Sequence, residues 1–467
     1  MKSLLIGLSA ALTFGTAPAG MTPGSIDAFL RQALESTGLP GFSVVVTHNG
    51  KVVHAAGYGH DSEGHAVTEN TPMRVASVSK SFTAMAVMTL VERGKIALDE
   101  PVASQLPGFR VADPRAAKIT VRQLLNQTSG LSDSTVDIAA VDSATSLADY
   151  TSRLAGSGLR ADPGTRWEYC NVNYNLAARL VEAASGQRFG DYLRQRVFGP
   201  LGMKSSAVSD QVVRPADGYN SIFGAWLPRP ELSGFLNGSG SGGVITTAAD
   251  MGKWLITQTG GGRPLVKRES LDVMHTPTKL RDYGMGWGVE RETGLLAHSG
   301  NLFTYNAVEA ISPKTGYGFA VMANGAALTD DTYTIMQGLN ALAEGRTPEP
   351  PGGDRQLFEL VLAAIAAAAA GLGVMGVLRS RRWAARHAGR PWWWIGLRLV
   401  PALLPAVMLA AYPDLISFLM NGREVTWAQL TYFPAPLSIT LLVTALAGVV
   451  ATGIRICVLR TLTRHTK

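Results

Sequence analysis

Two short sequence patterns contain residue types that can perform nucleophilic acyl transfer. Ser77 and Lys80 have Ser-x-x-Lys spacing at the start of a predicted helix over residues 77–93, which places both side chains on one helix face. A serine hydroxyl needs an adjacent base to act as a nucleophile, and a lysine in an apolar pocket can have its pKa lowered enough to help. The pattern therefore predicts a serine nucleophile, although alone it also fits a helix-capping serine and a solvated lysine.

The second pattern is Tyr169-Cys170-Asn171, which follows a Pro-Gly turn and leads into another predicted helix. A buried tyrosine near a lysine can relay protons, and an asparagine side chain can bind an amide group from both sides. The same residues also fit a core tyrosine followed by a helix-capping asparagine. The pattern is therefore a candidate site only in combination with the first.

A third candidate, His-Ser-Gly at residues 298–300, ends a predicted strand. A rival triplet, Lys-Thr-Gly at residues 314–316, follows Pro313 and lies between two apolar strands, which is typical of a turn. We therefore prefer the His298 triplet as the third part of a site.

The elements that must position these residues indicate one sheet built from both ends of residues 20–343. Asn49-Gly50, the favoured pair for a type I′ turn, separates strands predicted at residues 44–47 and 52–55. Later strands are predicted at residues 284–291, 294–299, 304–312 and 317–323, and the clearest helices between them at residues 120–127, 172–186 and 189–197. This order predicts an α+β fold with one antiparallel sheet and a helical insertion.

Taken together, the motifs resemble the serine beta-lactamase and penicillin-binding protein superfamily, in its class C-like branch, over residues 25–345. The landmarks occur in order: Arg-Val-Ala-Ser-Val-Ser-Lys at 74–80, Val-Arg-Gln-Leu-Leu at 121–125, Thr-Ser-Gly-Leu at 128–131, Tyr-Cys-Asn at 169–171, Pro-Leu-Gly-Met at 200–203, Gly-Gly at 242–243 and His-Ser-Gly at 298–300. The resemblance implies an antiparallel sheet sandwiched by helices, a mostly helical subdomain, and a cleft between them that holds the three motifs.

The resemblance also implies a role for each candidate residue. Ser77 would be the acyl-enzyme nucleophile, and Lys80 and Tyr169 would share the base and proton-relay work. The substrate-binding residues would be Asn171, His298, Ser299, Gly300 and Asn301. The backbone N–H groups of Ser77 and Asn301 would form the oxyanion hole, in which each donor typically contributes ~10²–10³ in rate.

Three positions depart from the family pattern. His298 stands where lactamases usually have lysine, and it is largely neutral at pH 7 by its reference pKa, which favours a peptidase or esterase over an efficient lactamase. Gln127 stands where many relatives have histidine, and we interpret it as a residue behind the site. Cys170 fills a position that is commonly serine or alanine, either as a small residue or as an accessible thiol. No metal or cofactor is expected, because the histidines and acids at residues 54–65 match no ligand spacing.

The C-terminal part of the chain has the composition of membrane helices. Residues 354–467 carry 12 basic and 4 acidic residues, a net charge of +8, while the rest of the chain carries −1. The chain's net charge of +7 therefore comes from this part and does not indicate a nucleic-acid partner. Apolar runs at residues 357–378, 392–412 and 436–459 are each long enough to cross a hydrocarbon core of ~30 Å. The alternative is a set of buried core helices, but too little polar chain remains to cover three of them.

Basic residues predict the orientation of these helices. Arginines at residues 379–390 and basic residues at 460–467 should be cytoplasmic, which places the C-terminus inside and residues 20–343 outside the cytoplasmic membrane. Residues 1–19 end in Ala17-Pro18-Ala19 and predict a signal peptide, and residues 344–356 predict a linker. Cys170 and Cys457 would then lie on opposite sides of the membrane, so no disulfide is expected.

The sequence therefore predicts a membrane-anchored extracytoplasmic serine hydrolase that acts on peptide amides or esters, for example D-amino-acid cell-wall peptides. One alternative is a class C type beta-lactamase. Another is a penicillin-binding sensor or scaffold with little turnover, because three spans are more than an anchor requires. The expected partners are the membrane and a small peptide, ester or beta-lactam substrate, and no sequence feature indicates an oligomeric state.

Overall fold

The computed structural model describes residues 21–465 apart from residues 233, 350, 421 and 422, so the predicted signal peptide lies outside the described residues. Its centre is a six-stranded antiparallel sheet with the strand order β2-β1-β10-β9-β8-β7. The strands are β1 Gly41–His48, β2 Lys51–Gly59, β7 Gly288–Val289, β8 Leu296–Asn301, β9 Asn306–Ile311 and β10 Tyr317–Ala323. Because β1 pairs with β10, early and late parts of the chain meet in one sheet, which confirms the predicted fold class.

The two edges of this sheet differ in how well the sequence predicted them. At one edge, Asn49 and Gly50 have φ angles of 48° and 77°, both positive as a type I′ turn requires. At the other, the strand expected over residues 284–291 is wrong, because β7 has only two residues. Gly286 has a φ of 83° and lies so close to helix α2 that a Cβ there would be 2.7 Å from the Ser81 nitrogen. This stretch turns around the start of α2 instead of extending.

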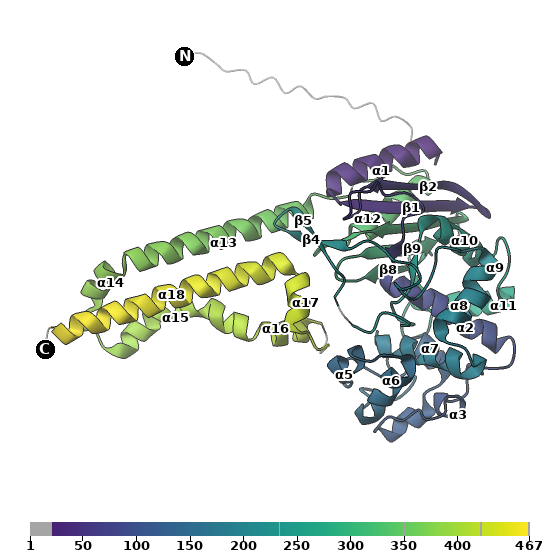
Figure 1. Ribbon diagram of the computed structural model, residues 1–467, viewed down its shortest axis with the longest axis horizontal. Helices are drawn as coiled ribbons and strands as arrows, with labels where there is room; N and C mark the ends of the chain where they lie inside the picture. The colour runs from purple at the N-terminus through teal and green to yellow at the C-terminus, as the bar shows by residue number, and fades with distance from the viewer. Residues whose placement is uncertain (1–20, 233, 350, 421–422, 466–467) are drawn as a thin grey trace, which may run out of the picture.

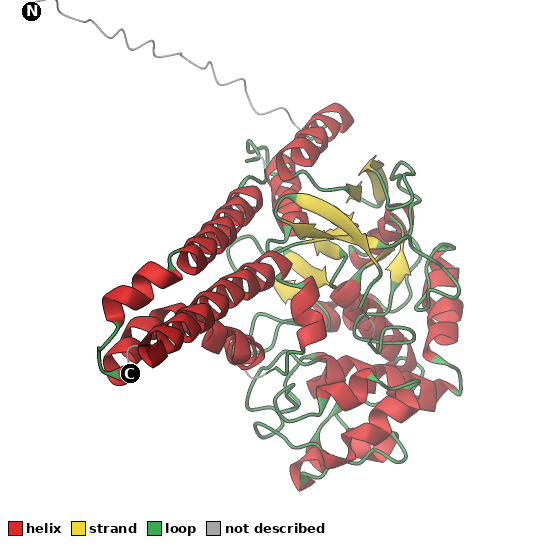
Figure 2. Ribbon diagram, turned by 60° about the vertical axis from the view of Figure 1, so that its left-hand side comes forward, coloured by secondary structure: helices red, strands yellow, loops and turns green. Residues whose placement is uncertain are grey.

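Helices cover both faces of the sheet (Figure 2). On one face, α1 Pro23–Thr37 and α12 Asp331–Ala343 share an apolar core with the strands. On the other lie α2 Ser79–Val91 and α10 Ala248–Gln258, where Phe82 stacks on Trp254 with ring centroids 4.0 Å apart. Apolar side chains surround α2, and burial of each large one contributes about 1.5–3 kcal/mol. The helix that carries Lys80 is therefore held rigidly in the core.

A mostly helical subdomain lies at one end of the sheet (Figure 1). Its helices are α3 Val102–Gln105, α4 Val121–Leu125, α5 Ile138–Asp142, α6 Leu147–Ser152, α7 Asn171–Ser185, α8 Phe189–Leu193 and α9 Gly199–Leu201. The remaining elements of the N-terminal domain (residues 21–343) are α11 Arg268–His275 and the short strands β3 Met73–Arg74, β4 Gly218–Ile222, β5 Ala225–Arg229, β6 Ile245–Thr246 and β11 Gly325–Ala326. The predicted helical insertion is thus present.

The C-terminal part is a bundle of helices that projects from the N-terminal domain (Figure 1). It consists of α13 Asp354–Leu378, α14 Ser380–His387, α15 Trp392–Ala410, α16 Tyr412–Leu419, α17 Trp427–Tyr432 and α18 Ala435–His465. Three of them, at residues 354–378, 392–410 and 435–463, are long and apolar enough to cross a membrane. Small residues allow close packing between them, since a Cβ on Gly373 would lie 2.8 Å from Ala447 of α18.

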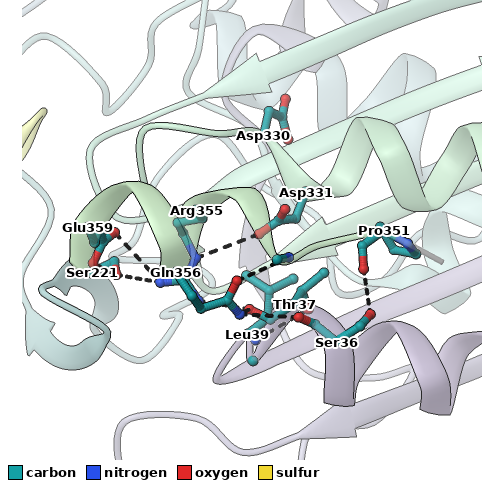
Figure 3. Close-up of polar contacts among 12 residues, drawn as sticks. Ser36, Thr37, Leu39, Ser221, Asp330, Asp331, Pro351, Arg355, Gln356 and Glu359 are labelled. Atoms are coloured by element: carbon teal, nitrogen blue, oxygen red, sulfur yellow. Dashed lines mark hydrogen bonds and ion pairs between the residues drawn. The ribbon is translucent and has the colours of Figure 1, made fainter. Parts of the chain in front are cut away.

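A buried polar cluster joins α13 to the N-terminal domain (Figure 3). Arg355, only 3% exposed, donates to the Thr37 carbonyl at 2.8 Å and to the Ser221 hydroxyl at 2.6 Å. Glu359 lies 3.6 Å from the Arg355 guanidinium and accepts from Ser221 and from the Gly224 N–H at 2.8 and 2.7 Å. We call Arg355, Glu359 and these partners the α13 joint. Breaking one side of such a buried ion pair typically costs 3–5 kcal/mol, so the joint fixes how the domain sits on the helices.

A buried carboxyl in β9 gives a prediction for stability. Glu309 is fully buried and accepts from Trp254 Nε1 at 2.8 Å, and burial raises its pKa from 4.5 to about 8. A raised folded-state pKa contributes stability below the unfolded pKa that is lost as pH rises towards 8. Glu309→Gln cannot ionise, so its melting temperature should fall less between pH 5 and pH 8 than that of the wild type. The pH slopes of the free energies of unfolding of the two proteins should differ by up to ~1.4 kcal/mol per pH unit.

The measurement is thermal unfolding of the full-length protein in detergent at several pH values. The exposed Glu292→Gln serves as the matched control and should keep the wild-type slope. Parallel pH profiles for Glu309→Gln and the wild type would show that the pKa of this carboxyl is not raised in the folded protein.

Candidate active site

The predicted nucleophile lies in a strained turn at the start of α2. Ser77 is the middle residue of a 3₁₀ turn, Ala76–Val78, that leads directly into the helix. Ala76 has a φ of +47°, in the left-handed region that costs a non-glycine residue roughly 1–2 kcal/mol. Gly300 of β8 approaches this turn, and a Cβ there would lie 2.9 Å from the Ser77 nitrogen. The close contact holds the end of β8 against the serine.

Lys80 lies beside this serine with its amine completely buried. Its Nζ donates to Ser77 Oγ at 3.0 Å, to Asn171 Oδ1 at 2.9 Å and to the Ser241 carbonyl at 2.8 Å. Burial, followed by the positive charge of Arg423, lowers the pKa of Lys80 well below its usual value. A neutral amine next to a serine hydroxyl can accept its proton, which is the requirement for activating the nucleophile.

Tyr169 lies on the other side of the amine, in the segment that precedes α7. Lys80 Nζ is 4.8 Å from the centre of its ring, and its hydroxyl forms a side-chain hydrogen bond with Ser77. Burial raises the pKa of Tyr169 above its usual value. The tyrosine is therefore a neutral phenol that can pass a proton rather than a standing phenolate. Asn171 begins α7, and its amide oxygen is occupied by Lys80.

His298 lies on β8 with its imidazole held neutral. Nδ1 is 2.7 Å from the Ser299 carbonyl and must donate to it, so Nε2 accepts from the Tyr283 hydroxyl at 3.1 Å. Burial, and secondarily the charge of Lys80, lowers the pKa of His298 to about 3. The ring centroids of His298 and Tyr169 are 6.2 Å apart, so the third motif does meet the second. This position therefore supplies no fixed positive charge.

All of these motifs border one cavity of about 770 Å³. The predicted residues that line it are Ser77, Tyr169, Asn171, His298, Ser299 and Asn301. Ser299 to Asn301 complete β8, where Asn301 pairs with Asn306 of β9 at the strand end nearest the serine. The oxyanion hole at the Ser77 and Asn301 N–H groups stays a prediction.

Sequence reasoning missed three residues of this region. The Ser241 carbonyl binds Lys80, and the Tyr283 hydroxyl fixes the histidine tautomer. Serine and tyrosine are too common in sequences for either to stand out. Arg423 also lines the cavity, although it comes from the segment between two candidate membrane spans. The sequence shows Arg423 between two apolar runs, but only tertiary packing brings it close to Ser77.

The structure also places Cys170, Lys314 and Gln127. Cys170 is fully buried with its thiol 3.2 Å from Asp133 Oδ1, so the alternative of an accessible thiol is wrong. Lys314 lies in the turn between β9 and β10, at the opposite sheet end from Asn301, as expected for a turn residue. Gln127 accepts from the Cys170 N–H and from Asn173 Nδ2, which places it behind the tyrosine. Within the described residues, no group of three or more His, Cys, Asp or Glu side chains could hold a metal ion.

Comparison with known proteins gives a consistent picture. The Beta-lactamase family model matches residues 26–343. Protein flp of Staphylococcus aureus strain MW2 is 28% identical over 64% of this chain and 62% of its own length, so the chain spans less than two thirds of that relative. Penicillin-binding protein 4 of Amycolatopsis lactamdurans is 30% identical over 68% of this chain and 91% of its own length.

Solved structures share the fold. An octameric penicillin-binding protein homologue from Pyrococcus abyssi has a TM-score of 0.61 at 24% identity and covers 74% of this chain and 82% of its own. A penicillin-binding protein from Bacillus halodurans has a TM-score of 0.58 at 23% identity and covers 68% and 98%. The D-amino acid amidase from Ochrobactrum anthropi, crystallised with L-phenylalanine amide, has a TM-score of 0.56 at 24% identity and covers 69% and 95%.

Proposed function

The chain belongs to the beta-lactamase family, which includes penicillin-binding proteins, and from this premise we propose that it is a membrane-anchored serine hydrolase acting through an acyl-enzyme on Ser77. The observation that carries the proposal is the 3.0 Å contact between Ser77 Oγ and a buried Lys80 amine of lowered pKa. The pair borders a cavity large enough for a small substrate.

The reaction has two halves. The Lys80 amine accepts the Ser77 hydroxyl proton while Oγ attacks the substrate carbonyl, and the bond to the leaving alcohol or amine breaks. That leaving group takes up a proton through Lys80 or the Tyr169 hydroxyl, and the acyl group stays on Ser77 as an ester. Water then attacks this ester, gives a proton to the same base, and releases the acid and the free serine.

We propose peptide amides or esters as substrates, with D-amino-acid cell-wall peptides as one example. A neutral His298 favours this over an efficient beta-lactamase, because it offers no fixed charge for a beta-lactam carboxylate. The 30% identical penicillin-binding protein supports a site that reacts with beta-lactams to some degree. Efficient turnover of nitrocefin would overrule the argument from His298.

We also propose that the catalytic domain lies outside the cytoplasmic membrane. The arginines at residues 379–390 and the basic residues at 460–467 then face the cytoplasm, as the positive-inside rule requires. A sensor or scaffold remains the second candidate function, because the α13 joint would transmit a change in the domain to the helices. A stable penicillin adduct without turnover would favour the sensor.

The test is active-site labelling of the full-length protein in detergent. Fluorophosphonate and fluorescent penicillin should each add one acyl or phosphonyl group to the peptide that contains Ser77, as read by mass spectrometry. A panel of short esters, D-alanyl peptides and nitrocefin should then give turnover of esters or peptides and little turnover of nitrocefin. Labelling at another residue, or no turnover of any member, would contradict the proposed hydrolase.

A further inference from the structure

The active-site cavity is bordered by part of the C-terminal bundle as well as by the catalytic motifs. The inter-helix segment (residues 411–420 and 423–434) connects the second and third candidate membrane spans. From this segment and the start of α18, the cavity is lined by Ile416, Leu419, Met420, Arg423, Phe433 and Leu437, among others. One cavity therefore joins Ser77 to residues that lie between two candidate membrane spans.

Two independent contacts fix this segment against the N-terminal domain. The Arg229 guanidinium lies 3.5 Å from the centre of the Tyr432 ring and donates to the Thr431 carbonyl at 2.7 Å. On the same side, Phe303 meets Tyr432 edge to face with centroids 5.8 Å apart. The α13 joint also holds the domain to the first candidate span (Figure 3). The wall that the segment adds to the cavity is thus built into the fold.

The apolar lining continues from the cavity onto the outside of α16. Leu419 and Met420 line the cavity and are also 69% and 46% exposed. Large exposed apolar side chains next to membrane spans lie in the interface of the bilayer. A hydrocarbon chain can therefore pass from the bilayer over α16 into the cavity without leaving apolar surroundings.

Arg423 is the cationic side chain among the described residues that line the cavity. Its Nε lies 3.4 Å from Asp133 Oδ2, but a guanidinium has five N–H donors in a planar fork that suits carboxylate and phosphate oxygens. Asp142 and Glu231 also line the cavity, and burial raises the pKa of both carboxyls. The site thus favours an anionic group near Arg423.

We propose that the substrate is an anionic membrane amphiphile, with its hydrocarbon chain against Ile416 and Leu437, its anionic group at Arg423 and its scissile carbonyl at Ser77. The proposal rests on the hydrolase function proposed above and adds the class of substrate. It also assigns the membrane part a role in specificity, because residues of the inter-helix segment bind the substrate directly. Because His298 is neutral, the anionic group would be bound by Arg423, which lies outside the catalytic motifs.

The first arm of the test measures chain length. Full-length protein in nanodiscs is assayed with 4-nitrophenyl acetate and with 4-nitrophenyl octanoate below its critical micelle concentration. Each enzymatic rate is divided by the rate of alkaline hydrolysis of the same ester, which corrects for intrinsic reactivity. The wild type should prefer the octanoate at least tenfold in kcat/KM. Ile416→Asp should bring this ratio close to one, while the matched control Phe418→Asp, on the same helix but outside the cavity lining, should keep it. Ile416→Ala repeats the comparison if the aspartate variant does not fold.

The second arm measures charge. In 4-nitro-3-(octanoyloxy)benzoic acid the leaving group carries a carboxylate, whereas 4-nitrophenyl octanoate is neutral. Arg423→Gln should lower kcat/KM for the anionic ester about tenfold more than for the neutral ester. Arg423→Lys should restore only part of the difference, because it keeps the charge but not the planar fork of donors.

The outcomes separate this inference from the function on which it rests. No hydrolysis of any ester by the wild type would contradict the proposed hydrolase. Hydrolysis of the acetate with no chain-length preference would overturn the proposal of an amphiphilic substrate but not the proposed hydrolase function. Equal octanoate-to-acetate ratios of kcat/KM in Ile416→Asp and Phe418→Asp would do the same. If Arg423→Gln lowered kcat/KM equally for both octanoyl esters, the proposal that Arg423 binds an anionic group of the substrate would be overturned.

Discussion

Ser77→Ala is expected to abolish labelling by fluorophosphonate and penicillin and to lower kcat/KM for the best ester by roughly 10⁴–10⁶-fold, the range seen when the nucleophile of a serine hydrolase is removed. The reason is geometric. Ser77 Oγ is the hydroxyl that lies 3.0 Å from the Lys80 amine, and it faces the cavity. The replacement removes the atom that would carry the acyl group, so no covalent intermediate can form.

The measurement combines steady-state kinetics with intact-protein mass after incubation with a slow substrate. Ser104→Ala, an exposed serine of α3 far from the cavity, is the matched control and should label and turn over like the wild type. Removal of one hydroxyl leaves the strained Ala76 turn in place, so the variant should keep the wild-type melting temperature. Retention of more than a hundredth of the activity in Ser77→Ala would mean that the acyl-enzyme mechanism is wrong.

The second large effect is expected at Lys80. Lys80→Arg keeps a long basic side chain but removes the base, because a guanidinium cannot be deprotonated in proteins. Loss of a positioned base typically lowers the rate 10²–10⁴-fold. We expect a loss near the upper end of this range, because burial leaves little room for water to replace the amine. A substitution by methionine should be equally inactive, which would separate loss of the base from overcrowding by arginine.

The pH profile of the wild type tests the same residue. Burial lowers the pKa of Lys80, and only the neutral amine accepts a proton, so kcat/KM should rise with slope one as pH rises through that lowered pKa and level off well below pH 10.5. Lys80→Arg should lose this acid limb. If the limb persisted unchanged in the residual activity of Lys80→Arg, another group would be the base.

The parts of the site that the sequence predicted are those set by local spacing. Ser77 and Lys80 meet because they are one helical turn apart, and Asn171 begins α7 in the segment that follows the Pro163-Gly164 turn. The strand 284–291 failed because its residues fit a strand pattern, whereas Gly286 must turn to clear α2. Sequence patterns report local preference, and tertiary contact overrides it at such positions.

The resemblance to a family, rather than spacing, predicted that the distant motifs lie together. Tyr169 and His298 come from separate elements, and only the packing of α7 and β8 against α2 sets their separation. Arg423 could not be predicted as a site residue for a different reason. Its approach to the serine depends on how the C-terminal bundle sits on the domain, and that arrangement is fixed by scattered single contacts such as Arg229 on Tyr432.

The α13 joint has a consequence for where such an enzyme can work. Catalytic domains on flexible tethers sweep a hemisphere whose radius grows with the linker, whereas Arg355 and Glu359 clamp this domain directly onto the top of its first helix. In the proposed topology, its working range would therefore be a thin layer, one domain deep, above the bilayer. It would not reach polymers further out, and it would meet its substrates by two-dimensional diffusion in the plane of the membrane.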